Sequence, residues 1–108
     1  MKIFTKAQEA QLIKNGKAGE DTTRKPVVKL FGGACTWLIS EKFEDGTLFG
    51  LCDLGMGFPE LGYVSQDELE AIKFQPFGLR IERDLHFRGE RPLTEYADDA
   101  RKTGKINA

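Results

Sequence analysis

The chain has 108 residues, of which 40% are hydrophobic and 31% are charged, and its formal net charge is −1. This length fits one domain with one hydrophobic core, because domains most often contain about 100–150 residues. No apolar run approaches the ~20 residues that span a bilayer, and no apolar segment follows Met1-Lys2 as in a secretory signal. The composition therefore argues against a membrane protein and predicts a cytoplasmic one.

The charge is unevenly distributed along the chain. Residues 1–29 hold seven Lys or Arg against three acids, whereas residues 41–70 hold eight acids against one Lys. The basic part lacks a dense cluster or a nucleic-acid motif, so nucleic-acid binding is not expected. The acidic part argues against an anion site there, yet its excess is far smaller than an acidic mimic of DNA would need.

A short helix is predicted over residues 6–14. Thr5 and Gln8 have the spacing of a capping box, in which each side chain satisfies the other residue's backbone amide. Gly16 is a favoured position for the helix to end. Residues 17–25 show no hydrophobic periodicity, so we expect a solvated, mobile connector there.

Three strands are predicted next, at about residues 27–31, 35–43 and 47–53, because β-branched and aromatic residues dominate these segments. The turn Glu44-Asp45-Gly46 is typical of a hairpin whose Gly46 adopts a left-handed conformation. The predicted register opposes Phe43 to Thr47, Ile39 to Leu51 and Trp37 to Asp53. One buried sheet face then carries Trp37, Ile39, Phe43, Phe49 and Leu51, and the other face carries Leu38, Ser40, Lys42, Leu48, Gly50 and Cys52.

The C-terminal half predicts two further helices and one strand. Ser65 is placed to cap a helix over about residues 66–73, and alternating apolar residues predict a half-buried strand over residues 79–88. The spacing of Leu93, Tyr96, Ala97 and Ala100 predicts a last helix that ends before Gly104. The order of elements predicts a single α+β domain with a largely antiparallel sheet and three short helices.

The signature segment, residues 52–64, is the most unusual part of the chain. Its sequence is Cys-Asp-Leu-Gly-Met-Gly-Phe-Pro-Glu-Leu-Gly-Tyr-Val, in which glycine and proline define the backbone shape of a loop. Asp53 stands where the chain leaves the sheet, and we expect its carboxylate to accept hydrogen bonds from the amides of residues 55–57. The loop's apolar side chains either pack down as anchors or face a partner: Met56, Phe58, Leu61 and Tyr63.

The sequence also offers residues for two kinds of chemistry, a hydrolase site and a phosphate-binding loop. An acid–base or metal-dependent hydrolase would use Asp53, Glu60, Asp84 and His86, the last being the only histidine. However, side chains two apart on a strand lie about 6.6–7 Å apart, which weakens a metal site built along one strand. The Gly55-x-Gly57 pair does not lead into a helix, so a phosphate cradle is not expected. No metal or cofactor is predicted.

The two cysteines, Cys35 and Cys52, lie in apolar strand-like segments and lack the C-x-x-C spacing of metal or redox pairs. We expect reduced, poorly accessible thiols that thiol reagents label slowly in the native protein.

The chain resembles a family of short bacterial proteins known only as a domain of unknown function, often encoded on plasmids, phages and integrated elements. The resemblance is carried nearly end to end by Pro26-Val27-Val28-Lys29-Leu30-Phe31, Thr36-Trp37-Leu38, the signature segment, Glu82-Arg83-Asp84-Leu85-His86-Phe87 and Pro92-Leu93. It implies a cytoplasmic accessory protein of mobile DNA that acts on host defence, replication or conjugation machinery. It transfers no catalytic residues.

Two classes of function follow from the residues. The favoured reading is a non-enzymatic protein-interaction factor whose signature segment contacts another protein through Met56, Phe58, Glu60 and Tyr63. The alternative is the hydrolase described above. A cleft in which its four residues converge would favour the enzyme. The sequence does not predict an oligomeric state.

Overall fold

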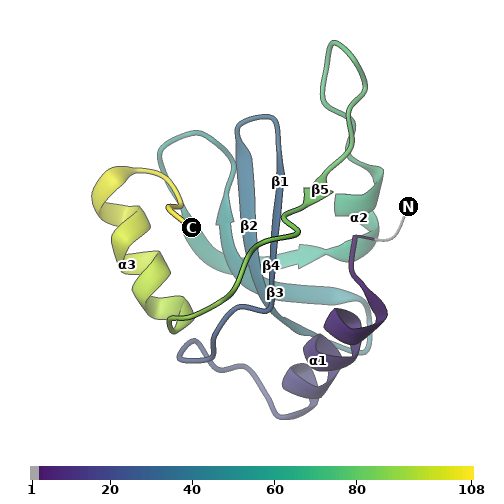
Figure 1. Cartoon of the computed structure of the whole chain (residues 1–108), viewed down its shortest axis with the longest axis vertical. Coiled ribbons are helices and arrows are strands. Elements are labelled where there is room, and N and C mark those ends of the chain that lie inside the picture. Colours follow the sequence, from purple (N-terminus) through teal and green to yellow (C-terminus); the bar gives the residue numbers. More distant parts are fainter. Residues whose placement is uncertain (1–2) are drawn as a thin grey trace.

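The computed structural model describes residues 3–108, which contain three helices and five strands (Figure 1). In chain order the elements are α1 (Lys6–Lys17), β1 (Val28–Gly32), β2 (Cys35–Lys42), β3 (Thr47–Asp53), β4 (Glu60–Ser65), α2 (Gln66–Ala71), β5 (Glu82–Arg83) and α3 (Leu93–Thr103). The strands form one antiparallel sheet in the order β4-β3-β2-β1-β5. This confirms the predicted α+β class.

The start of α1 is the predicted capping box. The Thr5 hydroxyl accepts a hydrogen bond from the Gln8 amide at 3.1 Å, and the Thr5 amide donates to the Gln8 side chain at 3.0 Å. The helix ends at Lys17, beyond the predicted boundary. Gly16 lies inside it, because a Cβ at this position would stand 2.1 Å from the Lys42 carbonyl oxygen. This glycine lets α1 approach β2 closely and does not end the helix.

Both faces of the sheet are buried. The α1-side cluster lies under α1 and α2 and is formed by Ile3, Phe4, Leu12, Val28, Leu30, Trp37, Ile39, Leu48, Leu69 and Ile81. The α3-side cluster lies under α3 and is formed by Leu38, Phe49, Leu51, Leu93, Tyr96, Ala97 and Ala100. The two clusters explain why β2 and β3 are apolar almost throughout: both sets of alternating side chains are withdrawn from water.

The predicted register of the β2–β3 hairpin is wrong by one residue over most of its length. The turn forms as expected, since the Phe43 amide donates to the Thr47 carbonyl at 2.9 Å and Gly46 has φ +86°. A bulge between Ile39 and Glu41 then shifts the pairing. The observed pairs include Trp37 with Cys52, Leu38 with Leu51 and Ile39 with Gly50.

The bulge changes which residues share a face. Trp37 and Ile39 lie in the α1-side cluster, whereas Phe49 and Leu51 lie in the α3-side cluster. The prediction that these four residues share one buried face is therefore wrong, although each is buried.

The C-terminal half departs from the prediction at two strands. β4 forms within the signature segment and continues into residue 65, although no strand was predicted there. Of the strand predicted over residues 79–88, only β5 pairs with the sheet, whereas Leu79 pairs with Phe74 in a separate hairpin. β5 stops because the Asp84 carboxylate accepts a hydrogen bond from the His86 amide at 2.8 Å, which forms a local turn. As a result Leu79 and Leu85 are exposed and not half-buried as predicted.

The two C-terminal helices lie where the sequence places them. Ser65 caps α2, which is two residues shorter than expected, by accepting a hydrogen bond from the Glu68 amide at 3.3 Å. α3 buries the four predicted residues, and Gly104 follows it with φ +82° in the left-handed cap conformation. Among residues 3–108, no helix has the length and hydropathy needed to cross a bilayer.

Candidate interaction surface

The loop between β3 and β4, residues 54–59, is held from below by Asp53. The side chain of Asp53 is only 3% exposed, and one of its oxygens accepts the Gly55 amide at 2.8 Å, as predicted. The other oxygen accepts the Ile106 amide at 3.0 Å. Both carboxylate oxygens therefore serve the backbone, and the C-terminal segment is attached to the same residue as the loop.

The backbone of this loop depends on its glycines. Gly55 and Gly57 have φ +79° and +84°, a region that other L-residues rarely adopt. A Cβ on Gly55 would lie 2.7 Å from the Cβ of Ala34, so the loop also rests closely on the turn between β1 and β2. Residues that lie far apart in the sequence thus define the shape of the loop.

The apolar side chains of this loop point into solvent. Leu54, Met56 and Phe58 are 54%, 71% and 79% exposed, and Glu60 is exposed at the start of β4. Met56 and Phe58 are therefore exposed and do not pack down as anchors of the loop. Leu61 differs, because it is partly buried against the α3-side cluster.

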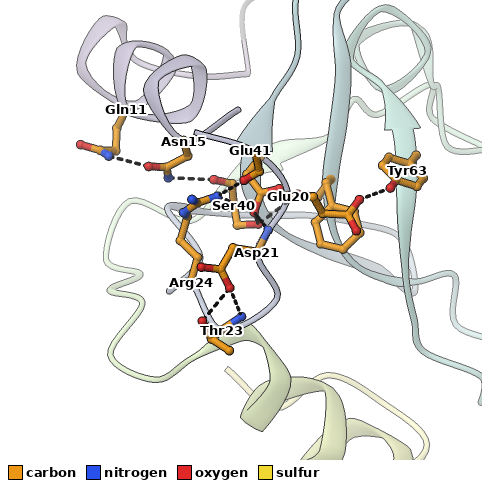
Figure 2. Close-up of polar contacts among 11 residues, drawn as sticks. Gln11, Asn15, Glu20, Asp21, Thr23, Arg24, Ser40, Glu41 and Tyr63 are labelled. Atoms are coloured by element: carbon orange, nitrogen blue, oxygen red, sulfur yellow. Dashed lines mark hydrogen bonds and ion pairs between the residues drawn. The ribbon is translucent and has the colours of Figure 1, made fainter. Parts of the chain in front are cut away.

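Tyr63 is both packed against the sheet and exposed to solvent. Its ring packs against Phe49 and Phe43, with centroid separations of 5.2 and 6.4 Å, while 59% of the residue remains exposed. Its hydroxyl donates a hydrogen bond to the Glu20 carboxylate (Figure 2). These contacts hold Tyr63 in one orientation on β4.

Another exposed aromatic, Phe77, projects on the other side of the β1–β2 turn (Figure 1). Phe74 and Leu79 pair in a small hairpin that carries Phe77 at its tip, where this side chain is 82% exposed. The ring of Phe74 lies over Gly32 and Gly33, since a Cβ on Gly32 would stand 2.4 Å from it. Figure 1 shows this hairpin, the β1–β2 turn and the β3–β4 loop projecting from the same end of the molecule. We call this surface the three-loop end.

The four residues of the hydrolase alternative are distributed over different surfaces. Asp84 and His86 line one cavity, together with Glu90 and Tyr96, whereas Glu60 lines another beside Phe58 and Arg101. The hydrogen bond from the His86 backbone amide and the Lys29 ammonium, whose Nζ lies 3.6 Å from Asp84 Oδ2, hold the pKa of Asp84 below its usual value. Nowhere in residues 3–108 do three or more His, Cys, Asp or Glu side chains gather as a metal site.

Glu41 is a buried charged residue for which the sequence predicted no role. Its side chain is 0% exposed and lies in a polar network between α1, β2 and residues 18–26 (Figure 2). One oxygen accepts the Ser40 hydroxyl at 3.1 Å and pairs with the Arg24 guanidinium at 3.0 Å. The alternation that predicted Ile39 and Phe43 on a core face also places Glu41 on that face. This pattern could have predicted that Glu41 is buried.

Glu41 fastens the segment that was predicted to be a mobile connector. Its carboxylate also accepts the Asp21 amide at 3.4 Å. The carbonyl groups of Thr22 and Arg24 accept the amides of Thr94 and Leu93 at the start of α3. The mobility of residues 17–25 stays a prediction, and these contacts argue for an ordered segment. They give Glu41 a structural role.

The two cysteines are free and partly buried. Burial raises the pKa of the Cys52 thiol to about 11, and burial together with the Asp53 carboxylate raises the pKa of Cys35. Since the thiolate is the reactive form, these surroundings support the expected slow labelling, which stays a prediction.

The match to known families covers almost the whole described chain. A family model described as "Protein of unknown function (DUF2958)" matches residues 3–107. The chain belongs to this DUF2958 family. No curated protein and no solved structure matches the chain of this DUF2958 protein.

Proposed function

We propose that this DUF2958 protein is a non-enzymatic protein-interaction factor that recognises its partner through the three-loop end. The observation that carries this proposal is the exposure of Met56 and Phe58 on a loop whose backbone is fixed by Asp53. Exposed aromatic and methionine side chains are characteristic anchors of protein interfaces. A loop that is already ordered loses less conformational entropy when it binds.

The proposed setting is the bacterial cytoplasm, in the service of a mobile genetic element. The resemblance described above supports this setting. Glu60 and Tyr63 are proposed to flank the apolar contacts, because both are exposed on β4, Glu60 directly after the loop and Tyr63 three residues further along. The hydrolase alternative has less support, since Asp53 uses both carboxylate oxygens to bind backbone amides.

The proposal predicts that the variant Phe58→Ala with Glu60→Ala loses its partner. Quantitative affinity capture from a host lysate should show at least tenfold depletion of the captured partner, because the interface anchor is removed. The urea midpoint should stay nearly unchanged, since both side chains are exposed.

Two variants serve as controls for this experiment. Leu85→Ala removes a side chain that is 77% exposed but lies away from the loop, and it should retain capture. His86→Ala should also retain capture. If the loop variant keeps full capture, or if His86→Ala or Asp84→Ala abolishes a measurable hydrolytic activity, the interaction proposal is wrong and the enzyme alternative replaces it.

A further inference from the structure

β4 forms one edge of the sheet. It pairs with β3 without interruption from Cys52–Glu60 to Thr47–Ser65, and the sheet order places no strand of the described chain on its other side. None of the six residues of β4 is buried. An edge strand of this kind presents backbone groups to which another strand can pair.

The hydrogen-bonding phase of β4 identifies the outward groups. The Gln66 amide donates to the Gly46 carbonyl at 3.1 Å and so continues the β3–β4 ladder by one pair. Antiparallel strands alternate between residues that bond their partner and residues that face away from it. The backbone groups of Leu61 and Tyr63 therefore face outward, and within the described chain they have no backbone partner.

β4 lacks the features that usually protect an edge strand. Between Glu60 and Ser65 it contains no Lys, no Pro and no bulge. The opposite edge is different, because β5 is only two residues long and the turn at Asp84 ends it. One edge of the sheet is thus short and closed, whereas the other is regular and open.

The charge around β4 indicates what kind of strand it accepts. Residues 43–72 contain no Lys or Arg and seven carboxylates: Glu44, Asp45, Asp53, Glu60, Asp67, Glu68 and Glu70. Glu60 is exposed at one end of β4, where it lines a cavity with Arg101, and Asp67 and Glu68 are exposed just beyond the other end. An antiparallel second copy would bring Glu60 towards these acids of its partner. Like charges at this position disfavour self-pairing, and a basic partner is favoured.

We propose that β4 is an acceptor strand that adds an extended, Lys- or Arg-bearing segment of the partner protein to the sheet. The backbone groups of Leu61 and Tyr63 supply the hydrogen bonds, and the acids at both ends of β4 attract the basic side chains. This inference rests on the proposed function and names its binding mode. The β3–β4 loop leads directly into β4, so one partner can contact both.

The test uses a synthetic probe and does not need the natural partner. A seven-residue peptide that alternates Lys and Val, blocked at both ends, is titrated into ¹⁵N-labelled protein. The amides of Leu61 and Tyr63 should shift and gain protection from hydrogen exchange. The same peptide N-methylated at every residue, and a peptide with Glu in place of Lys, should bind at least tenfold more weakly.

A charge variant separates attraction at β4 from general attraction to an acidic protein. Asp67→Lys should weaken binding of the Lys-Val peptide about three- to tenfold. Glu95→Lys introduces the same charge change at an exposed first-turn position of α3 and should not weaken it comparably.

Three results would overturn the acceptor-strand proposal. These are no binding at millimolar peptide, equal binding of the N-methylated peptide, or shifts that avoid Leu61 and Tyr63. A concentration-dependent dimer that protects these two amides would also overturn it, because the occupant would be a second copy. None of these results decides the capture experiment with the variant Phe58→Ala with Glu60→Ala. That experiment depends on Phe58 and on the natural partner.

Discussion

At the scale of single residues, Glu41 is where burial and charge conflict most directly. Burial raises the pKa of Glu41 above its ordinary value of 4.5, and the hydrogen bonds and the Arg24 charge only partly offset this effect. Because the folded pKa lies above the unfolded one, the folded state keeps the proton over a pH range in which the unfolded chain has lost it. Stability therefore falls as the pH rises through this range.

The variant Glu41→Gln tests this linkage. It removes the ionisable group and keeps the size, so it should gain urea stability relative to the wild type as the pH is raised from 4 to 7. At pH values below the pKa of Glu41 in the unfolded chain, the urea midpoints of the two proteins should differ least. A difference in urea midpoint that stays constant over this pH range would contradict the assignment.

Arg24→Ala is the complementary control. It removes the positive partner of a buried carboxylate, so it should cost stability mainly at neutral pH, where Glu41 is ionised. At pH 4 this cost should shrink.

At the scale of elements, the sequence predicted most helices and strands but not the pairing of β2 with β3. The caps at Thr5 and Ser65 and the spacing of apolar residues in α3 are local signals, and all three helices formed where these signals lie. The bulge between Ile39 and Glu41 has no such signal. Both faces of these strands are apolar, so alternation does not distinguish one register from the next.

β4 was missed for a related reason. Gly62 and Pro59 reduce the strand tendency of the signature segment, whereas continuous pairing with β3 favours a strand. The loop itself was partly predictable, because Asp53 accepts the Gly55 amide as expected. The second hydrogen bond of Asp53 comes from the Ile106 amide, 53 positions away, and local sequence patterns do not predict it.

The paired residues Gly50 and Gly62 offer a test of the sheet packing. A Cβ on Gly50 would stand 2.0 Å from the Leu38 carbonyl oxygen, so Gly50→Ala should destabilise the protein by about 1–3 kcal/mol or more. Within the described residues nothing lies within 4 Å of a Cβ on Gly62, and its φ is not positive. Gly62→Ala should be neutral or stabilise by up to about 0.5–1 kcal/mol. Equal effects in urea unfolding would refute the observed register.

At the scale of the whole molecule, distant segments converge to support the three-loop end. The C-terminal residues return to the sheet, where Ile106 packs against the α3-side cluster and its amide binds Asp53. On the opposite side, Phe74 closes over the β1–β2 turn. The exposed loop is therefore supported by the C-terminal segment through Asp53 and by the β1–β2 turn through Ala34, as a preorganised binding surface requires.

Asp53→Asn tests this long-range support. The Gly55 and Ile106 amides donate to different oxygens of Asp53, and asparagine replaces one of these oxygens with an NH2 group that cannot accept. One hydrogen bond to a charged acceptor, worth about 1.5–3 kcal/mol, is therefore lost. Hydrogen exchange of at least one of these two amides should accelerate about tenfold or more. The amide of Leu12, a buried residue of α1 on the other face of the sheet, measures the change due to global unfolding. If Gly55 and Ile106 accelerate no more than Leu12, Asp53 does not hold the loop and the C-terminal segment together, and the preorganisation on which recognition depends must come from the glycines and Ala34 alone.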